Sequence, residues 1–157
     1  MKKLILITIL STLTLLAQEL QIKAKQFDAD QKTGITILRG DVNIIKGADE
    51  LNASKVTIYT NENQEPTKFV AEGNASFNIQ TEDGSLYEGK AQKAIYYPIT
   101  KEYHFFDDVF LKQVNEKKEI MGKEVILKTI EGKAYAKGAD KKPVIMIFDL
   151  PEKKEKK

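Results

Sequence analysis

Few side chains of this 157-residue chain have the chemistry that an enzyme or a metal site needs. Cysteine is absent, which excludes thiolate nucleophiles, zinc-thiolate sites and a disulfide framework. His104 is the only histidine, and no serine in a nucleophile motif lies near it, so neither an acyl-transfer triad nor a histidine-rich metal site is expected. We interpret His104 as an ordinary strand residue.

Three acidic pairs are the remaining candidates for chemistry, because glycoside hydrolases and calcium sites both use neighbouring carboxylates. Each pair falls in a predicted turn or at a predicted strand end, where aspartate is common. We therefore predict no catalytic residues, no metal site and no cofactor. The pairs are Asp28 with Asp30, Glu82 with Asp83, and Asp107 with Asp108.

Two asparagines lie in sequons with an acidic residue two positions earlier, a pattern that some bacterial N-glycosylation systems use. They are Asn52 in Glu50-Leu51-Asn52-Ala53-Ser54 and Asn74 in Glu72-Gly73-Asn74-Ala75-Ser76. Short sequons arise readily by chance, and both coincide with repeated elements described below. The sequence leaves their modification open.

The N-terminal residues are typical of a signal peptide, since Lys2 and Lys3 precede an apolar run that ends at Ala17. We predict cleavage after Ala17, which gives a signal peptide of residues 1–17, one mature domain of residues 18–150 and a periplasmic location. Leu15 is large for a cleavage site, so an uncleaved anchor is the alternative. The run is shorter than the about 20 residues that a bilayer span needs.

Charge is balanced over the mature chain. The chain has 25 Lys and Arg against 23 Asp and Glu, and Lys2 and Lys3 account for the whole difference. Lysines alternate with acidic residues and form no cluster that would neutralise several phosphates, so we predict no nucleic acid partner. Residues 151–157 are polar and are predicted to form a disordered tail.

Short alternating runs bounded by turn residues recur along the mature chain, whereas helical periodicity is weak. This pattern predicts an all-β fold of short antiparallel strands. Turns are expected at residues 32–34, 61–63, 82–84, 98–100 and 131–132. Strands are expected at 20–28, 35–38, 42–45, 55–60, 68–71, 75–80, 93–97, 103–106, 109–114, 124–129, 133–136 and 144–148.

A repeated unit of about 30 residues organises these strands. Its markers are Gly40, Gly73, Asp107 and Gly138, and each is expected to close a short strand. Apolar residues follow the first three markers at two and four places, which puts them on one face of their strands and predicts a shared core. These residues are Val42, Ile44, Ala75, Phe77, Val109 and Leu111.

A second strand of each unit matches between residues 53–59, 91–97 and 122–127. Its in-phase pairs are Val56 with Ile58, Ala94 with Tyr96, and Val125 with Leu127. A unit of this size cannot bury its apolar face alone, so several units must stack or roll together. A jellyroll, a solenoid and a sandwich all satisfy this requirement.

These elements together resemble the OstA/LptA family of periplasmic lipopolysaccharide-transport proteins, over essentially the whole mature chain. Asp107 departs from the repeat, which expects glycine there, and a different turn conformation is an open alternative at that position. The elements that carry the resemblance are Leu20-Gln21-Ile22-Lys23-Ala24, Gly40-Asp41-Val42, Leu51-Asn52-Ala53-Ser54-Lys55-Val56, Gly73-Asn74-Ala75 and Glu88-Gly89-Lys90-Ala91.

The resemblance implies an open, twisted β-jellyroll whose apolar interior receives the acyl chains of lipid A. It also implies a non-enzymatic carrier that moves lipopolysaccharide from the inner to the outer membrane, through head-to-tail copies of itself and LptC-like and LptD-like partners. Family contacts fall at Leu20, Ile22, Phe77 and Tyr96. Together with the in-phase residues, the predicted acyl-chain contacts are Leu20, Ile22, Val42, Ile44, Val56, Ile58, Phe77, Ala94, Tyr96, Val109, Leu111 and Leu127.

The terminal runs 20–28 and 144–150 are predicted to be unpaired edges. If they pair between molecules, strand addition builds a non-closing chain, which is the geometry of a bridge. Three alternatives stay open: a membrane-anchored LptC-like protein of the same pathway, a structural β-repeat protein of the envelope, and an envelope hydrolase.

Overall fold

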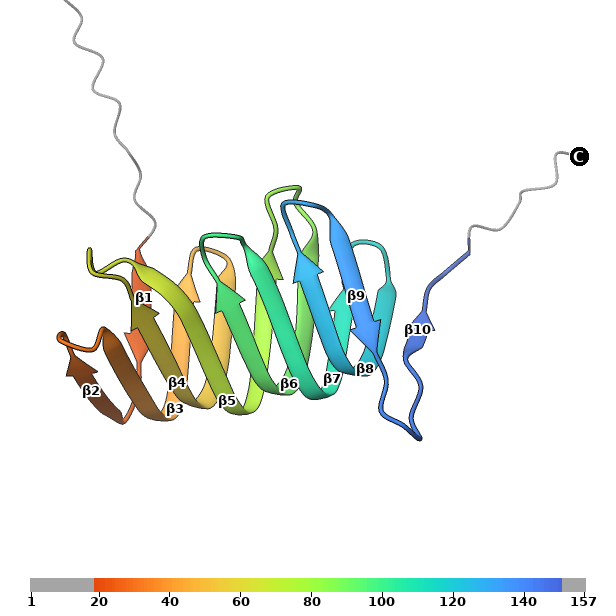
Figure 1. Cartoon of the computed structure of the whole chain (residues 1–157). Helices are drawn as coiled ribbons and strands as arrows, with labels where there is room; N and C mark the ends of the chain where they lie inside the picture. Colours follow the sequence, from red (N-terminus) through yellow and green to blue (C-terminus); the bar gives the residue numbers. More distant parts are fainter. Residues whose placement is uncertain (1–18, 151–157) are drawn as a thin grey trace, which may run out of the picture.

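The computed structural model describes residues 19–150, which form ten strands in one antiparallel sheet (Figure 1). The all-β prediction and all five predicted turns are confirmed. The signal peptide and the polar tail lie outside the described residues. The strands are β1 Leu20–Lys23, β2 Gln26–Asp30, β3 Ile35–Lys46, β4 Asp49–Thr60, β5 Pro66–Gln80, β6 Leu86–Tyr97, β7 Glu102–Gln113, β8 Lys118–Lys128, β9 Lys133–Lys137 and β10 Ile145–Ile147.

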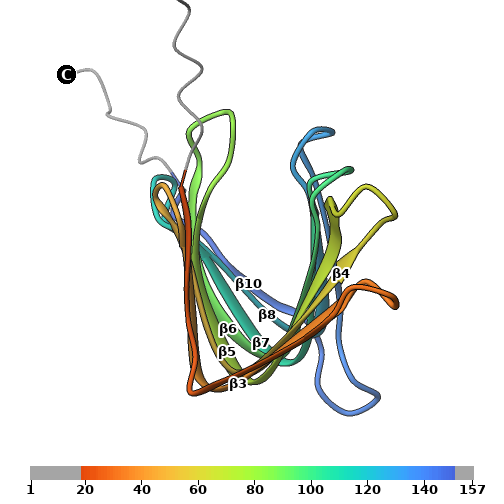
Figure 2. The ribbon, with the colours of Figure 1, turned by 90° about the vertical axis from the view of Figure 1, so that its left-hand side faces the viewer.

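The sheet is folded along its middle into two walls, which give it a U-shaped cross-section (Figure 2). Strands β3 to β8 cross the fold, and the pairing register shifts there at each of their five pairings. Wall A comprises residues 26–39, 55–72, 93–106 and 124–137. Wall B comprises residues 20–23, 42–52, 75–90, 109–122 and 145–147.

The repeat markers Gly40, Gly73 and Asp107 lie at this bend, within continuous strands. Their φ angles are 78°, 83° and 61°, and the next residue is also left-handed in each case. Glycine adopts this conformation without a steric penalty, and aspartate and asparagine tolerate it better than most residues. The prediction that these markers close short strands is therefore wrong. The bend at Asp107 has the same left-handed conformation as the bends at the two glycines.

Several predicted strands are halves of longer ones for this reason. Residues 35–38 and 42–45, for example, are the two halves of β3. Conversely, the single strand predicted at residues 20–28 is two strands, β1 and β2, which pair with the two halves of β3. Gly138 does follow the end of a strand, β9, as predicted.

The core lies between the walls, near the bend. The six residues that follow the markers are all buried in one apolar cluster, so the predicted shared core is confirmed. Wall A contributes a cross-strand row of Leu38, Val56, Ala71, Ala94, Phe105 and Val125.

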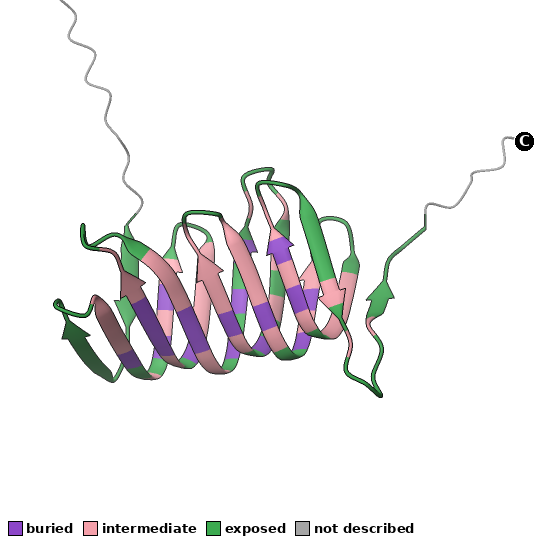
Figure 3. Ribbon diagram, in the orientation of Figure 1, coloured by how far each residue is buried: buried purple, intermediate pink, exposed green. Residues whose placement is uncertain are grey.

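The sheet does not close, and it has two edges at each end. β1 and β2 pair with the halves of β3, and β10 and β9 pair with the halves of β8. These four short strands are the most exposed of the structure (Figure 3). The predicted terminal edges are thus confirmed. Residues 19–150 contain no helix that is long and apolar enough to cross a membrane.

The bend generates a prediction that compares two glycines with equal φ. A Cβ on Gly73 (φ 83°) would lie 2.8 Å from the Cβ of Ser54, whereas a Cβ on Gly84 (φ 84°) meets no atom within 4 Å. We expect Gly73→Ala to lower the free energy of unfolding by about 2–3 kcal/mol, and Gly84→Ala by about 1 kcal/mol. Urea unfolding of the mature chain measures both, and equal losses would contradict the steric role of this bend.

Candidate ligand-binding groove

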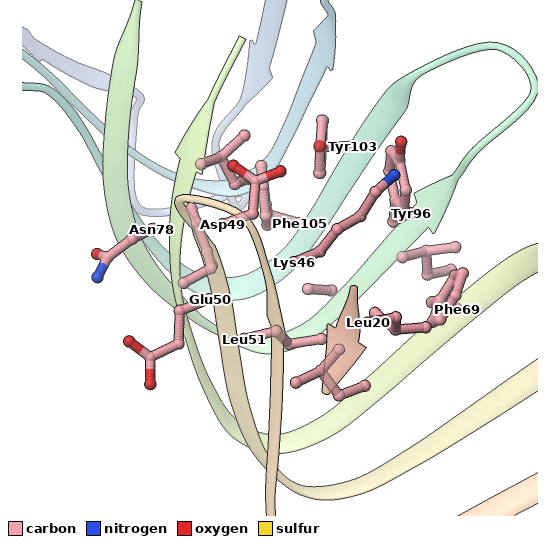
Figure 4. Close-up of a pocket in the computed structure, with 15 residues that line it drawn as sticks. Leu20, Lys46, Asp49, Glu50, Leu51, Phe69, Asn78, Tyr96, Tyr103 and Phe105 are labelled. Atoms are coloured by element: carbon pink, nitrogen blue, oxygen red, sulfur yellow. The ribbon is translucent and has the colours of Figure 1, made fainter. Parts of the chain in front are cut away.

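An apolar groove lies between the two walls, toward the end that carries β1 (Figure 4). Its cavity volume is about 110 Å³. Wall A lines it with Phe69, Ala94, Ile95, Tyr96, Tyr103 and Phe105, and wall B with Leu20, Ile44, Leu51, Phe77 and Ile79. The polar residues beside it are Lys46, Asp49, Glu50 and Asn78.

Aromatic rings form a continuous row along wall A. Ring centroids are 6.1 Å apart between Phe69 and Tyr96, 4.5 Å between Tyr96 and Tyr103, and 6.3 Å between Tyr103 and Phe105. The row crosses three neighbouring strands, because strand pairing places Phe69, Tyr96 and Tyr103 side by side. Such a surface offers a bound apolar group extended contact.

One aromatic contact joins the two walls inside the groove. Phe77 of wall B stacks on Phe105 of wall A, with ring centroids 4.2 Å apart. Gly89 makes room for this arrangement, because a Cβ at that position would lie 2.6 Å from the Cζ of Phe77. The Phe77–Phe105 contact therefore sets the separation of the walls at this depth.

The two tyrosines of the groove are held in the neutral form. Burial raises the pKa of Tyr103 well above its usual range, and the nearby Tyr96 hydroxyl and Asp49 carboxylate act in the same direction. Burial also raises the pKa of Tyr96. Asp49 is positioned at the wall B rim by a 2.7 Å hydrogen bond that the Gln80 backbone N–H donates to its Oδ1. The groove therefore presents aromatic and hydroxyl groups without phenolate charge.

The sequence candidates for chemistry lie outside the groove. His104 is on the outer face of wall A, where its Nε2 is 3.2 Å from Oε2 of Glu102. Hydrogen bonding to His104, together with Lys128, lowers the pKa of Glu102. The three acidic pairs lie on β2, at the β7 bend and in the turn after β5. Within residues 19–150 no three histidine or carboxylate side chains are grouped so that they could hold a metal ion.

The two sequon asparagines have different surroundings. Asn52 lies within β4, where its Oδ1 accepts a hydrogen bond from Asn43 Nδ2 at 2.8 Å and its Nδ2 donates one to Glu50 Oε1 at 3.4 Å. Asn74 is exposed at the β5 bend and has a φ of 48°. The left-handed conformation at the bend is a structural reason for an asparagine at position 74.

The predicted contact residues separate into three groups. Leu20, Ile44, Phe77, Ala94 and Tyr96 line the groove. Ile22 lies on the β1 edge, where it is 37% exposed. The other six are buried in the core and do not line the groove: Val42, Val56, Ile58, Val109, Leu111 and Leu127.

Three of the groove residues that the sequence analysis missed follow a simple rule. Phe105 and Tyr103 precede the marker Asp107 by two and four places, as Ala71 and Phe69 precede Gly73. All four face inward, so the alternation of inward-facing residues that follows each marker along the chain also applies to the residues that precede it. Counting in both directions would have found Phe69, Tyr103 and Phe105.

The geometry above can be compared with known proteins. A family model described as LptA/(LptD N-terminal domain) LPS transport protein matches residues 21–133. The chain belongs to this family of lipopolysaccharide-transport proteins. The predicted OstA/LptA membership is therefore confirmed. A search of curated proteins finds no match.

A solved structure shares the fold of this LPS-transport family member. It is LptH from Pseudomonas aeruginosa, described as the LptA homologous periplasmic component of the conserved lipopolysaccharide transport device. The similarity has a TM-score of 0.74 and 18% sequence identity, and it covers 85% of this chain and 96% of LptH. The predicted open β-jellyroll is confirmed.

The raised tyrosine pKa values predict a loss of stability in alkali. Tyr103 stays neutral in the folded protein, whereas it ionises at a pH of about 10 in the unfolded chain. Its contribution is fully present below that pH and is lost as the pH rises above it, by up to about 1.4 kcal/mol per pH unit. Urea unfolding between pH 9 and 11 should show this slope.

Tyr103→Phe should make the slope shallower, because it removes the group that resists ionisation. Tyr135→Phe is the matched control for the loss of a tyrosine hydroxyl, since Tyr135 is 55% exposed on the outer face of β9, and Tyr103→Phe should have the shallower slope of the two. An unaltered slope in Tyr103→Phe would show that this tyrosine ionises freely in the folded protein.

Proposed function

We propose that this chain is a periplasmic, non-enzymatic carrier that binds the acyl chains of lipid A in its groove and passes lipopolysaccharide from the inner to the outer membrane. The observation that carries the proposal is the apolar, aromatic-lined groove between the walls of an unclosed sheet. Membership of a lipopolysaccharide-transport family and the likeness to a periplasmic component of that transport device support it.

The groove can hold a saturated chain by apolar contact alone. Burial gives about 0.8 kcal/mol per CH₂, or about 8 kcal/mol for ten carbons before ordering costs. These contacts have no preferred direction, so the chain can shift along the groove without breaking specific bonds. That property suits a protein that must release its ligand to the next carrier.

Loading requires the walls to separate. Ligand pockets for molecules far smaller than lipid A measure about 300–1,000 Å³. The present cavity, at about 110 Å³, is below that range. The stacked Phe77 and Phe105 rings are in the way of a chain that runs along the groove, so they separate when the ligand enters.

Adjacent aromatic residues give a matched test of ligand binding. Tyr96 lines the groove, whereas Tyr97 lies on the opposite face and packs against His104 at 5.1 Å between ring centroids. A photo-crosslinking residue in place of Tyr96 or Phe77 should capture lipopolysaccharide, and the same residue in place of Tyr97 should not. Equal yields at positions 96 and 97 would contradict binding in the groove.

The exposed edges are proposed to join copies head to tail, and to join the terminal copies to LptC-like and LptD-like partners. β10 offers Ile145, Met146 and Ile147, which are 49%, 59% and 49% exposed, and β1 offers Leu20 and Ile22. Both edges also present unpaired backbone groups, which strand addition would satisfy. The balanced charge of the surface suits protein and lipid partners, not nucleic acid.

Removing one edge should therefore prevent growth of the assembly. Deletion of residues 144–150 should abolish concentration-dependent self-association in light scattering, because it removes β10 and with it the exposed Ile145, Met146 and Ile147. The folded state of the variant is checked by its unfolding transition. Unchanged self-association of a folded variant would rule out this edge as the contact.

A further inference from the structure

An ion pair spans the mouth of the groove. The Lys101 ammonium contacts the Glu82 carboxylate; Glu82 lies in the turn before β6 and Lys101 in the turn after it. β6 has 12 residues, so its ends would be about 40 Å apart if it were straight. The bend brings these turns to opposite rims of the mouth, Glu82 on wall B and Lys101 on wall A (Figure 2).

This ion pair differs from the others in the part of the chain that the structure describes. The other ion pairs join residues of one wall, or two residues at the bend in the case of Lys25 and Asp41. Between residues 19 and 150, the Glu82–Lys101 pair is thus the one ion pair that links wall A to wall B.

Both turns that carry the pair are held by their own wall. On wall B, Asn115 accepts a hydrogen bond from the Leu86 N–H at 2.6 Å, and its Nδ2 is 3.4 Å from the Gly84 carbonyl oxygen. On wall A, the Thr129 hydroxyl donates to the Lys101 carbonyl oxygen at 2.7 Å. The two charges therefore move apart when the walls do.

The pair lies above the aromatic contact. On wall B, Phe77 lies closer to the bend than Glu82 does, and on wall A, Phe105 lies closer to the bend than Lys101 does. The two walls are thus in contact at two depths, through the aromatic rings and through the ion pair. Both contacts lie near the middle of the strand order from β1 to β10. In the proposed carrier the acyl chains lie in the groove and the sugar headgroup lies outside its mouth. The bonds that join them cross the mouth, so they must pass between Glu82 and Lys101 as the lipid moves along the groove.

We propose that Glu82 and Lys101 form a latch across the groove mouth, and that an anionic phosphate on the lipid headgroup opens it by replacing the Glu82 carboxylate on the Lys101 ammonium. The inference rests on the proposed carrier function. A lysine ammonium binds carboxylate and phosphate alike, as a point charge. The exchange replaces one exposed charge pair with another, so it is nearly neutral in free energy and readily reversed.

Charge-removing variants distinguish a latch from a stabilising surface pair. If the pair is a latch, removing the charge of Glu82 and removing the charge of Lys101 change the affinity for lipopolysaccharide in opposite directions. Glu82→Gln removes the competitor for Lys101, so the affinity for phosphorylated lipopolysaccharide should rise about two- to fivefold, the range for exposed ion pairs. Lys101→Gln removes the phosphate partner, so the affinity should fall by a similar factor. The difference in affinity between phosphorylated and dephosphorylated lipopolysaccharide should shrink in this variant.

The matched controls are Glu116→Gln and Lys118→Gln, since this exposed pair lies within the wall B rim and does not cross the mouth. Neither control should change the affinity for either lipid. Changes of equal sign in Glu82→Gln and Lys101→Gln, or no change in either, would overturn the latch. If the unaltered chain binds neither lipid, the carrier function itself fails.

A covalent tether tests the same step, because the chain has no cysteine of its own. A thiol-reactive linker between cysteines in Glu82→Cys/Lys101→Cys should block loading, measured as the loss of lipopolysaccharide capture by a photo-crosslinker in place of Tyr96. The control tether, Glu82→Cys/Glu116→Cys, joins two turns of wall B, and capture by this variant should be the same with and without the linker. Undiminished capture with the mouth tethered would overturn the proposal.

Discussion

The bend at the centre of strands β3 to β8 is the constraint on which the rest of the structure depends. A single flat sheet of these strands would leave both faces in water and would have no interior. Two consecutive left-handed residues, such as Gly73 and Asn74 with φ of 83° and 48°, turn each of β3, β5 and β7, and the pairing resumes beyond the bend with a shifted register. The conformational cost at these positions is repaid by the apolar core between the walls.

The bend also divides the interior into a packed core and the open groove that we propose as the ligand site. Near the bend the walls converge, and small residues such as Ala53, Ala75 and Ala91 are buried in the narrow space between them. Farther from it the walls diverge, and larger side chains such as Tyr96 and Tyr103 stand beside open space. The same inward phase thus serves stability at one depth and the proposed ligand contact at another, so the two roles compete less than the shared face suggests.

The alternation of inward- and outward-facing residues could be predicted from the sequence, whereas the bend could not. Counting two and four places from Gly40, Gly73 and Asp107 identified residues that share a core. The markers themselves were misread as strand ends, because a turn and a bend within a strand use the same Gly, Asn and Asp chemistry. The half-strand Leu86–Lys90 was also missed: its inward positions are Tyr87 and Gly89, and at Gly89 the Phe77 ring from the neighbouring strand occupies the space. Because glycine has no side chain, position 89 contributes no apolar residue to the alternating pattern.

The bend finally restricts what can extend the groove. Each end of the sheet has two edges, one per wall: β2 and β1 at one end, β9 and β10 at the other. A flat strand added to β10 would lengthen wall B alone, and the groove would end there. To lengthen both walls, a partner needs strands that bend at the same level, with apolar residues on the inner face of both halves. A continuous path for an acyl chain therefore requires neighbours with the same bent strands, which is what further copies of this chain or relatives of its fold supply.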